Sequence, residues 1–136
     1  MAEIDDIPNE AKLYYRISKS IFNPNFDFDD IPPMAFRPQG EDLSTNWDKY
    51  CINAEACLAM PGRKRTNQTH GVGHFIAGEI RNIKFLEVVH SPGAHQSHAS
   101  VFGIPPTKPL EPFVEMTMKL KRIFNSWDIR PINAIE

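Results

Sequence analysis

The segment KLYYRIS, residues 12–18, is the first predicted strand, and the fold prediction starts from it. β-Branched and aromatic side chains dominate the segment, and successive residues alternate between two faces. One face carries Leu13, Tyr15 and Ile17, and the other carries Tyr14, Arg16 and Ser18. A period of two is typical of a strand that is buried on at least one face.

Further along the chain, the pattern predicts more strands and two helices. Residues 74–83 and 84–92 are two candidate strands, separated by a short break at Asn82 that suggests a hairpin or a bent pair, and residues 98–104 form another. Helices are predicted at about 46–59 and 110–126. The expected fold is therefore α+β, with a small, mainly antiparallel sheet packed against these two helices.

Caps and apolar stripes support both helices. Ser44 or Thr45 is expected to cap the first helix, and Pro61 with Gly62 ends it. The second helix has one continuous apolar stripe. This stripe consists of Phe113, Met116, Leu120, Ile123, Phe124 and Trp127.

Composition favours one soluble domain. The chain has 136 residues, of which 41% are hydrophobic and 24% are charged, and its net charge is −2. This composition argues against a disordered chain. The small net charge argues against nucleic acid and anionic membranes as partners. No apolar run is long enough for a membrane span, and the acidic start is unlike a signal peptide, so a cytoplasmic location is expected. Cys51 and Cys57 are expected to be reduced, buried thiols.

Three connecting segments have distinct compositions. Residues 1–11 form a polar leader that is frayed or lightly docked on the single domain. Residues 23–43 contain prolines, carboxylates and aromatic residues, which favours an ordered loop fixed by its aromatic side chains. Residues 62–73 form a basic loop bounded by glycines, for which a mobile state is expected.

Three histidines within nine positions, His90, His95 and His98, are the main candidates for chemistry. A metal site needs three or four ligands that converge on one point. Ser91, Pro92 and Gly93 are strong turn residues, and imidazoles in such turns commonly bond to backbone groups. We therefore expect a structural turn that joins two strands, with no metal and no cofactor.

The proline-rich loop is the candidate surface for a protein partner. Its candidate contact residues are Phe26, Phe28, Met34 and Phe36. Exposed aromatic and methionine side chains beside carboxylates suit a partner that is anchored by aromatic contacts.

Five short motifs resemble a family of small bacterial proteins of uncharacterised function. They are LYYRIS at 13–18, PPMAFRP at 32–38, DLSTNWDKYC at 42–51, GVGHFIAGEIRNI at 71–83 and HASVFGI at 98–104. The resemblance implies no activity. It does mark the positions to test first, which are Arg16, Ser44, Trp47, His98 and Gly103.

The front half is also similar to the opening of ADP-ribosyltransferase-like domains, in the order of a strand ending in Tyr-Arg, a proline-rich loop and a Leu-Ser-Thr that leads into a helix. This resemblance implies that Arg16, Ser44 and Thr45 hold NAD, with the guanidinium bonded to phosphate. The catalytic glutamate of that family has no clear counterpart, because Glu79 and Glu87 lie in predicted strands.

Two functions therefore remain open. The first is a non-catalytic, cytosolic bacterial protein that binds a protein partner, as an accessory, adaptor or immunity-type subunit of a toxin or defence operon. The alternative is an NAD-dependent ADP-ribosyltransferase-like enzyme or a degenerate relative. The oligomeric state stays open.

Overall fold

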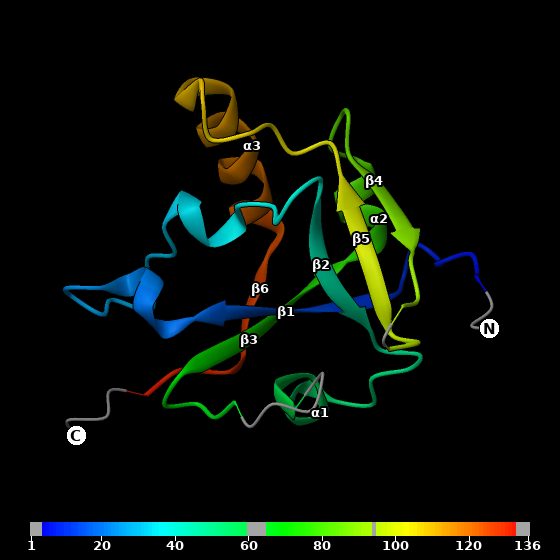
Figure 1. Ribbon diagram of the computed structural model, residues 1–136, viewed down its shortest axis with the longest axis horizontal. Helices are drawn as coiled ribbons and strands as arrows, with labels where there is room; N and C mark the ends of the chain where they lie inside the picture. Colours follow the sequence, from blue (N-terminus) through cyan, green and yellow to red (C-terminus); the bar gives the residue numbers. More distant parts are fainter. Residues whose placement is uncertain (1–3, 60–64, 94, 133–136) are drawn as a thin grey trace.

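A six-stranded antiparallel sheet forms the centre of the computed structural model, which describes residues 4–59, 65–93 and 95–132 (Figure 1). The strands are β1 (Lys12–Ser18), β2 (Asp42–Trp47), β3 (His70–Ile76), β4 (Glu87–His90), β5 (His98–Phe102) and β6 (Asn125–Ile129). The helices are α1 (Ala54–Ala59), α2 (Ala77–Arg81) and α3 (Leu110–Ile123), with 3₁₀ turns η1 (Lys19–Phe22) and η2 (Pro33–Phe36). The predicted α+β class is confirmed.

The strands lie in the order β4-β5-β2-β1-β3-β6. β1 is central, and it pairs with β3 over seven residue pairs, from Lys12↔Ile76 to Ser18↔His70. Its pairing with β2 is much shorter, because the register contains only Leu13↔Trp47 and Tyr14↔Asn46. β1 and β2 are therefore joined closely at one end only.

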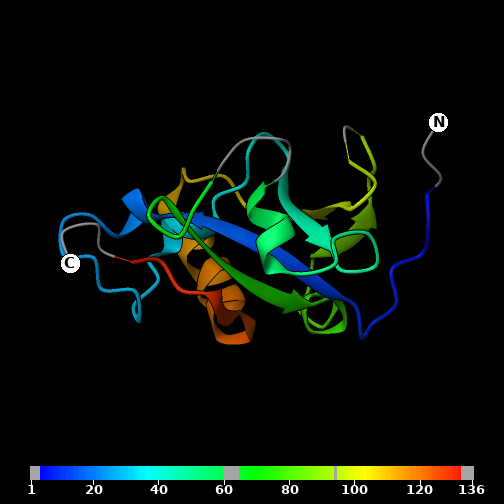
Figure 2. The ribbon, with the colours of Figure 1, turned by 90° about the horizontal axis from the view of Figure 1, so that it is seen from below.

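Alternation along the strands gives the sheet two different faces. Figures 1 and 2 show α3 and α1 on opposite sides of it. The α3 face carries the main core, which includes Leu13, Ile17, Leu43 and Phe75. The α1 face carries a smaller cluster of Tyr14, Cys51, Ala54, Cys57, Leu58 and Val72. This second face also holds polar side chains of β1 and β2, which define the candidate site below.

The helix predicted at 46–59 is corrected by the structure. Its first two residues, Asn46 and Trp47, end strand β2, residues 48–53 form a turn region, and only Ala54–Ala59 is helical. Leu43 and Thr45 are buried on the α3 face while Ser44 is exposed, so this segment follows the period of a strand. Ser44 and Thr45 lie inside β2 and cap no helix. Pro61 and Gly62 lie outside the described residues.

The second predicted helix is confirmed as α3, but it ends at Ile123 and the chain then forms strand β6. Two glycines of β3 explain the change. A Cβ on Gly71 would lie 2.5 Å from Trp127, and one on Gly73 would lie 2.3 Å from Phe124. The bare backbone of β3 thus accepts both rings, and their burial keeps the chain after α3 against the sheet.

The other strand predictions agree with the structure in part. β1 has the predicted bounds, and β4 and β5 lie within their predicted segments. The segment 74–83 is not one strand, because β3 ends at Ile76 and α2 follows at once. Ala77 and Ile80 of α2 are fully buried, so the apolar pattern reflects a buried helical turn.

Both polar segments expected to be loosely held are anchored where they are described. Ile7 in the leader is buried, and Asp5 forms an ion pair with Lys49 over 2.8 Å. The Asp5 backbone N–H also donates to His90. In the basic loop, residues 62–64 lie outside the described residues, and His70–Gly73 belongs to strand β3.

Candidate functional site

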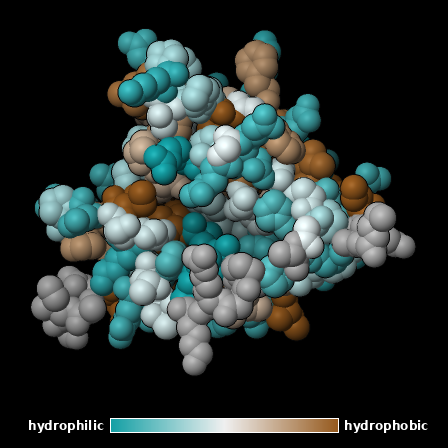
Figure 3. Space-filling view, viewed as in Figure 1, coloured by the Kyte–Doolittle hydropathy of each residue, from teal (hydrophilic) through white to brown (hydrophobic). Residues whose placement is uncertain are grey.

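A cavity opens where β1 and β2 separate. Beyond Tyr14↔Asn46 the two strands are no longer paired, and both faces of the sheet contribute side chains to the space between them. The cavity has a volume of about 380 Å³. Its lining residues are Tyr15, Arg16, Arg37, Gln39, Leu43, Ser44 and Arg65. Figure 3 shows a hydrophilic hollow near the middle of this side of the molecule.

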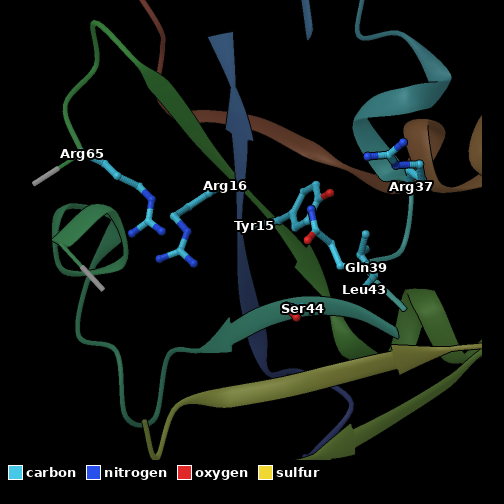
Figure 4. A pocket seen from close by; sticks show the side chains of 7 residues that line it. All are labelled: Tyr15, Arg16, Arg37, Gln39, Leu43, Ser44 and Arg65. Carbon is cyan, nitrogen blue, oxygen red and sulfur yellow. The ribbon is translucent and has the colours of Figure 1, made fainter. Parts of the chain in front are cut away.

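Three arginines from three separate segments line this cavity. Arg16 comes from β1, Arg37 follows η2, and Arg65 precedes β3. Figure 4 shows Arg16 and Arg65 on one side of Tyr15 and Arg37 on the other. None of the described lining residues is a carboxylate. Guanidinium groups gathered in this way favour an anion that accepts several charge-assisted hydrogen bonds.

Ser44 contributes a small, exposed hydroxyl side chain to the lining of the cavity. Tyr14 and Asn46 are partners in the pairing of β1 with β2. Arg16 lies two residues after Tyr14 and Ser44 two residues before Asn46, so their side chains lie on the same face of the sheet. Arg16 is held in place because its Nη1 donates to the Cys57 carbonyl of α1 over 2.8 Å. A hydroxyl beside fixed guanidinium groups can donate a further hydrogen bond to an anion.

A second cavity of about 240 Å³ adjoins the first. It shares Tyr15, Arg16, Arg37, Gln39 and Arg65 with the first cavity. Its additional lining residues are Ile17, Ser18, Ile21, Met34, Ala35 and His70. The two cavities are therefore contiguous, and the second has a more apolar wall.

The surroundings fix the protonation of two lining groups. Burial raises the pKa of Tyr15 far above its usual range, so the phenol stays neutral, and its hydroxyl donates to the Ala35 carbonyl. Burial lowers the pKa of His70 below its ordinary 6.5, and the charges of Arg65 and Arg16 lower it further. His70 is therefore a neutral imidazole at pH 7.

The two cysteines are buried free thiols, as predicted. A hydrogen bond between the thiols lowers the pKa of Cys57 and raises that of Cys51. The positive charges of Arg16 and Arg65 also favour the Cys57 thiolate, although burial opposes it. The arginines of the cavity therefore influence the pKa of Cys57 together with burial.

In the histidine-rich turn, the side chain of His90 has a structural role. Its Nδ1 accepts from the Asp5 backbone N–H over 2.9 Å, and its Nε2 donates to the Gln96 carbonyl over 2.7 Å. The ring is 2% exposed and stacks on Tyr50, with a centroid distance of 5.5 Å. Both ring nitrogens are thus used by the backbone, which agrees with the prediction of a turn that binds backbone groups.

His98 belongs to a polar chain that leads across the β4–β5 hairpin. Its Nδ1 contacts Ser91 Oγ at 2.8 Å, Ser91 Oγ contacts Ser100 Oγ at 2.7 Å, and Ser100 donates to Asp42 at 2.6 Å. His95 is half-buried, and its carbonyl accepts from the His98 backbone N–H. The three predicted histidines therefore do not converge. Within residues 4–59, 65–93 and 95–132, no group of three His, Cys, Asp or Glu is arranged to hold a metal.

Of the residues predicted to hold a nucleotide, the structure brings two together. Arg16 and Ser44 line the same cavity. Thr45 is buried on the opposite face, where its hydroxyl donates to the Ala99 carbonyl. Trp47 is 3% exposed and packs edge-on against Tyr50 and His90, so it is a core residue.

The prediction that the proline-rich loop presents an aromatic contact surface is wrong for its three phenylalanines. Phe36 is fully buried and Phe28 is 7% exposed, and both belong to the main core. Phe26 is partly buried and packs against the same core. Met34 alone of the four is exposed, at 41%. Burial of these rings keeps the proline-rich loop in place beside the cavity.

Sequence reasoning missed Arg37, Gln39, Arg65 and His70 as residues of the site. A basic run at 63–65 was visible, but no pattern connected it with Arg37, which is distant in sequence. The signal that was present is the loop PPMAFRP, where Phe36 enters the core and the next side chain, Arg37, points toward the cavity.

Comparisons with family models, with curated proteins and with solved structures gave no match for this chain. In the described part of the chain, no helix has the length and apolar character of a membrane span.

Proposed function

We propose that this protein is a cytosolic binding module for a small anion that carries phosphate. The observation that supports it is that Arg16, Arg37 and Arg65 line one cavity whose described lining has no carboxylate. Planar guanidinium groups match the geometry of phosphate oxygens, and bonds to charged groups contribute about 1.5–3 kcal/mol each.

Binding of inorganic phosphate tests the proposal. Phosphate at millimolar concentration is expected to raise the melting temperature relative to chloride of the same ionic strength, because a ligand that binds only the folded state stabilises it. Arg16→Gln and Arg65→Gln are each expected to weaken phosphate binding by about tenfold or more in calorimetric titration. Arg81→Gln is the matched control, because Arg81, at the end of α2, donates to the Asn9 side chain and does not line the cavity. Equal affinity in all of these variants would refute the site.

Binding should also depend on pH through His70, which lines the second cavity beside Arg16 and Arg65. Because the pKa of His70 is lower in the folded protein than in the unfolded chain, the unfolded chain binds the proton at a higher pH. This group therefore lowers the free energy of unfolding of the free protein as pH falls below 6.5. A bound anion offsets the arginine charges and favours the imidazolium. We therefore expect sulfate, whose charge is constant in this range, to bind more tightly at pH 5.5 than at pH 7.5. Titration calorimetry measures the difference, and His70→Gln should reduce it.

The NAD-dependent alternative overlaps with this proposal at Arg16 and Ser44, and it places phosphate in the same cavity. Thr45 does not favour it, because its hydroxyl faces the other side of the sheet. NAD added to the same melting experiment separates the two proposals. Stabilisation by NAD at concentrations where phosphate has no effect would favour the alternative.

Protein-partner binding is a second candidate, and exposed Met34 is the observation that favours it. This side chain lies at the rim of the second cavity, so a partner could contact it directly. Co-elution of the protein with the product of a neighbouring gene, lost in Met34→Asp, would support a protein partner. The same result with no response to phosphate would replace the anion proposal.

A further inference from the structure

The cavity system is larger than an inorganic anion needs. The arginine-lined cavity has a volume of about 380 Å³, and the adjoining cavity adds one of about 240 Å³ that shares five lining residues. Sites for drug-sized ligands have volumes of about 300–1,000 Å³. A ligand whose charged group sits between Arg16 and Arg65 therefore has room for an organic part in the second cavity.

The second cavity has the chemistry of a site for a compact organic group. Ile21, Met34 and Ala35 form an apolar wall, and Gln39 and Ser18 supply polar groups beside it. In Figure 3, hydrophobic side chains adjoin the hydrophilic hollow on the side of the η1 and η2 turns. A charged surface and an apolar surface therefore lie next to each other in the two cavities.

The geometry points to a phosphate ester that carries a flat ring, with its phosphate beside Arg16, Arg65 and Ser44 and its ring in the second cavity. This inference rests on the proposed function. It adds that the ester group, and not the phosphate alone, determines the affinity. Any such ester has the same two-part chemistry, whether its ring is a simple aryl group or a nucleobase.

Two lining side chains favour a ring over an alkyl chain. The Met34 thioether is exposed at 41%, and methionine sulfur makes favourable contacts with aromatic rings. Arg37 lines both cavities, and its planar guanidinium can stack on a ring face. The amide of Gln39 can then bond to polar atoms at the ring edge.

Titration calorimetry with four probes tests the inference. Inorganic phosphate, butyl phosphate, phenyl phosphate and uridine 5′-monophosphate are compared at one ionic strength. Phenyl phosphate is expected to bind about tenfold more tightly than inorganic phosphate, and butyl phosphate should fall between them. Tighter binding of the uridine ester than of phenyl phosphate would identify a nucleobase, and equal or weaker binding would identify a plain aryl group.

Met34→Ala is the decisive variant, because this side chain is exposed and its loss leaves the core unchanged. It should weaken phenyl phosphate about fivefold and leave inorganic phosphate unchanged. Met118→Ala is the control, since Met118 is exposed at 47% on α3 and does not line either cavity. If phosphate binds but phenyl phosphate binds no more tightly, or butyl phosphate binds as tightly as phenyl phosphate, the ring site is refuted and the anion site stands. If neither phosphate nor its esters bind, the proposed function itself fails.

Discussion

Replacing Gly103 with alanine is expected to remove about 4 kcal/mol or more of the free energy of unfolding. This glycine follows β5 and has a φ angle of 106°, which side chains rarely adopt. A Cβ at this position would lie 2.0 Å from the Phe85 carbonyl oxygen, which is backbone and cannot rotate away. The variant should unfold at much lower urea concentration than the parent, as followed by circular dichroism.

Gly93→Ala is the control for this experiment. A Cβ on Gly93 meets no atom within 4 Å, and its φ angle is not in the left-handed region. We expect its stability to stay within about 0.5 kcal/mol of the parent protein. A Gly103→Ala variant as stable as the control would show that the Phe85 carbonyl can move away from a Cβ at position 103. The close approach of the backbone at Gly103 to the backbone at Phe85 would then be wrong.

The second large effect is expected for Phe36→Ala, at about 3–5 kcal/mol of lost stability. Phe36 is fully buried, and its ring lies 5.9 Å from Tyr15, 6.0 Å from Phe75 and 5.4 Å from Phe124, measured between ring centroids. Removing the ring leaves a cavity that these three rings cannot fill. Urea unfolding followed by tryptophan fluorescence measures the loss.

Met34→Ala is the matched control, because Met34 lies two residues earlier in the same 3₁₀ turn and is exposed. It should change stability by less than about 0.5 kcal/mol. Similar losses in both variants would contradict the assignment of Phe36 to the core. The comparison also separates two parts of the proline-rich loop, since Phe36 supports the fold and Met34 lines the second cavity.

Periodicity predicted the elements in which one pattern dominates. β1 alternates along its whole length, and α3 has an apolar stripe over several turns, so both appeared where expected. One helix was predicted at 46–59 because Trp47, Ala54 and Leu58 are spaced like a helical face. Those residues in fact belong to a strand and to a separate helix, and the turn between them breaks the apparent period.

The candidate site was predictable only in part, for a similar reason. Arg16 and Ser44 were singled out by resemblance, and they do share a cavity. Arg37 and Arg65 join them because β1 and β2 separate, and the length of a strand pairing is a property of tertiary packing. Aromatic side chains hold the proline-rich loop in place, as predicted, but the same packing removes Phe26, Phe28 and Phe36 from the contact surface that was also predicted.

The short β1–β2 pairing divides the sheet into two three-stranded halves, β4-β5-β2 and β1-β3-β6. Arg16 belongs to one half and Ser44 to the other. A ligand that bonds to both side chains, as proposed above, would link the two halves where β1 and β2 are not paired. Binding of that ligand would then also hold the two halves of the sheet together.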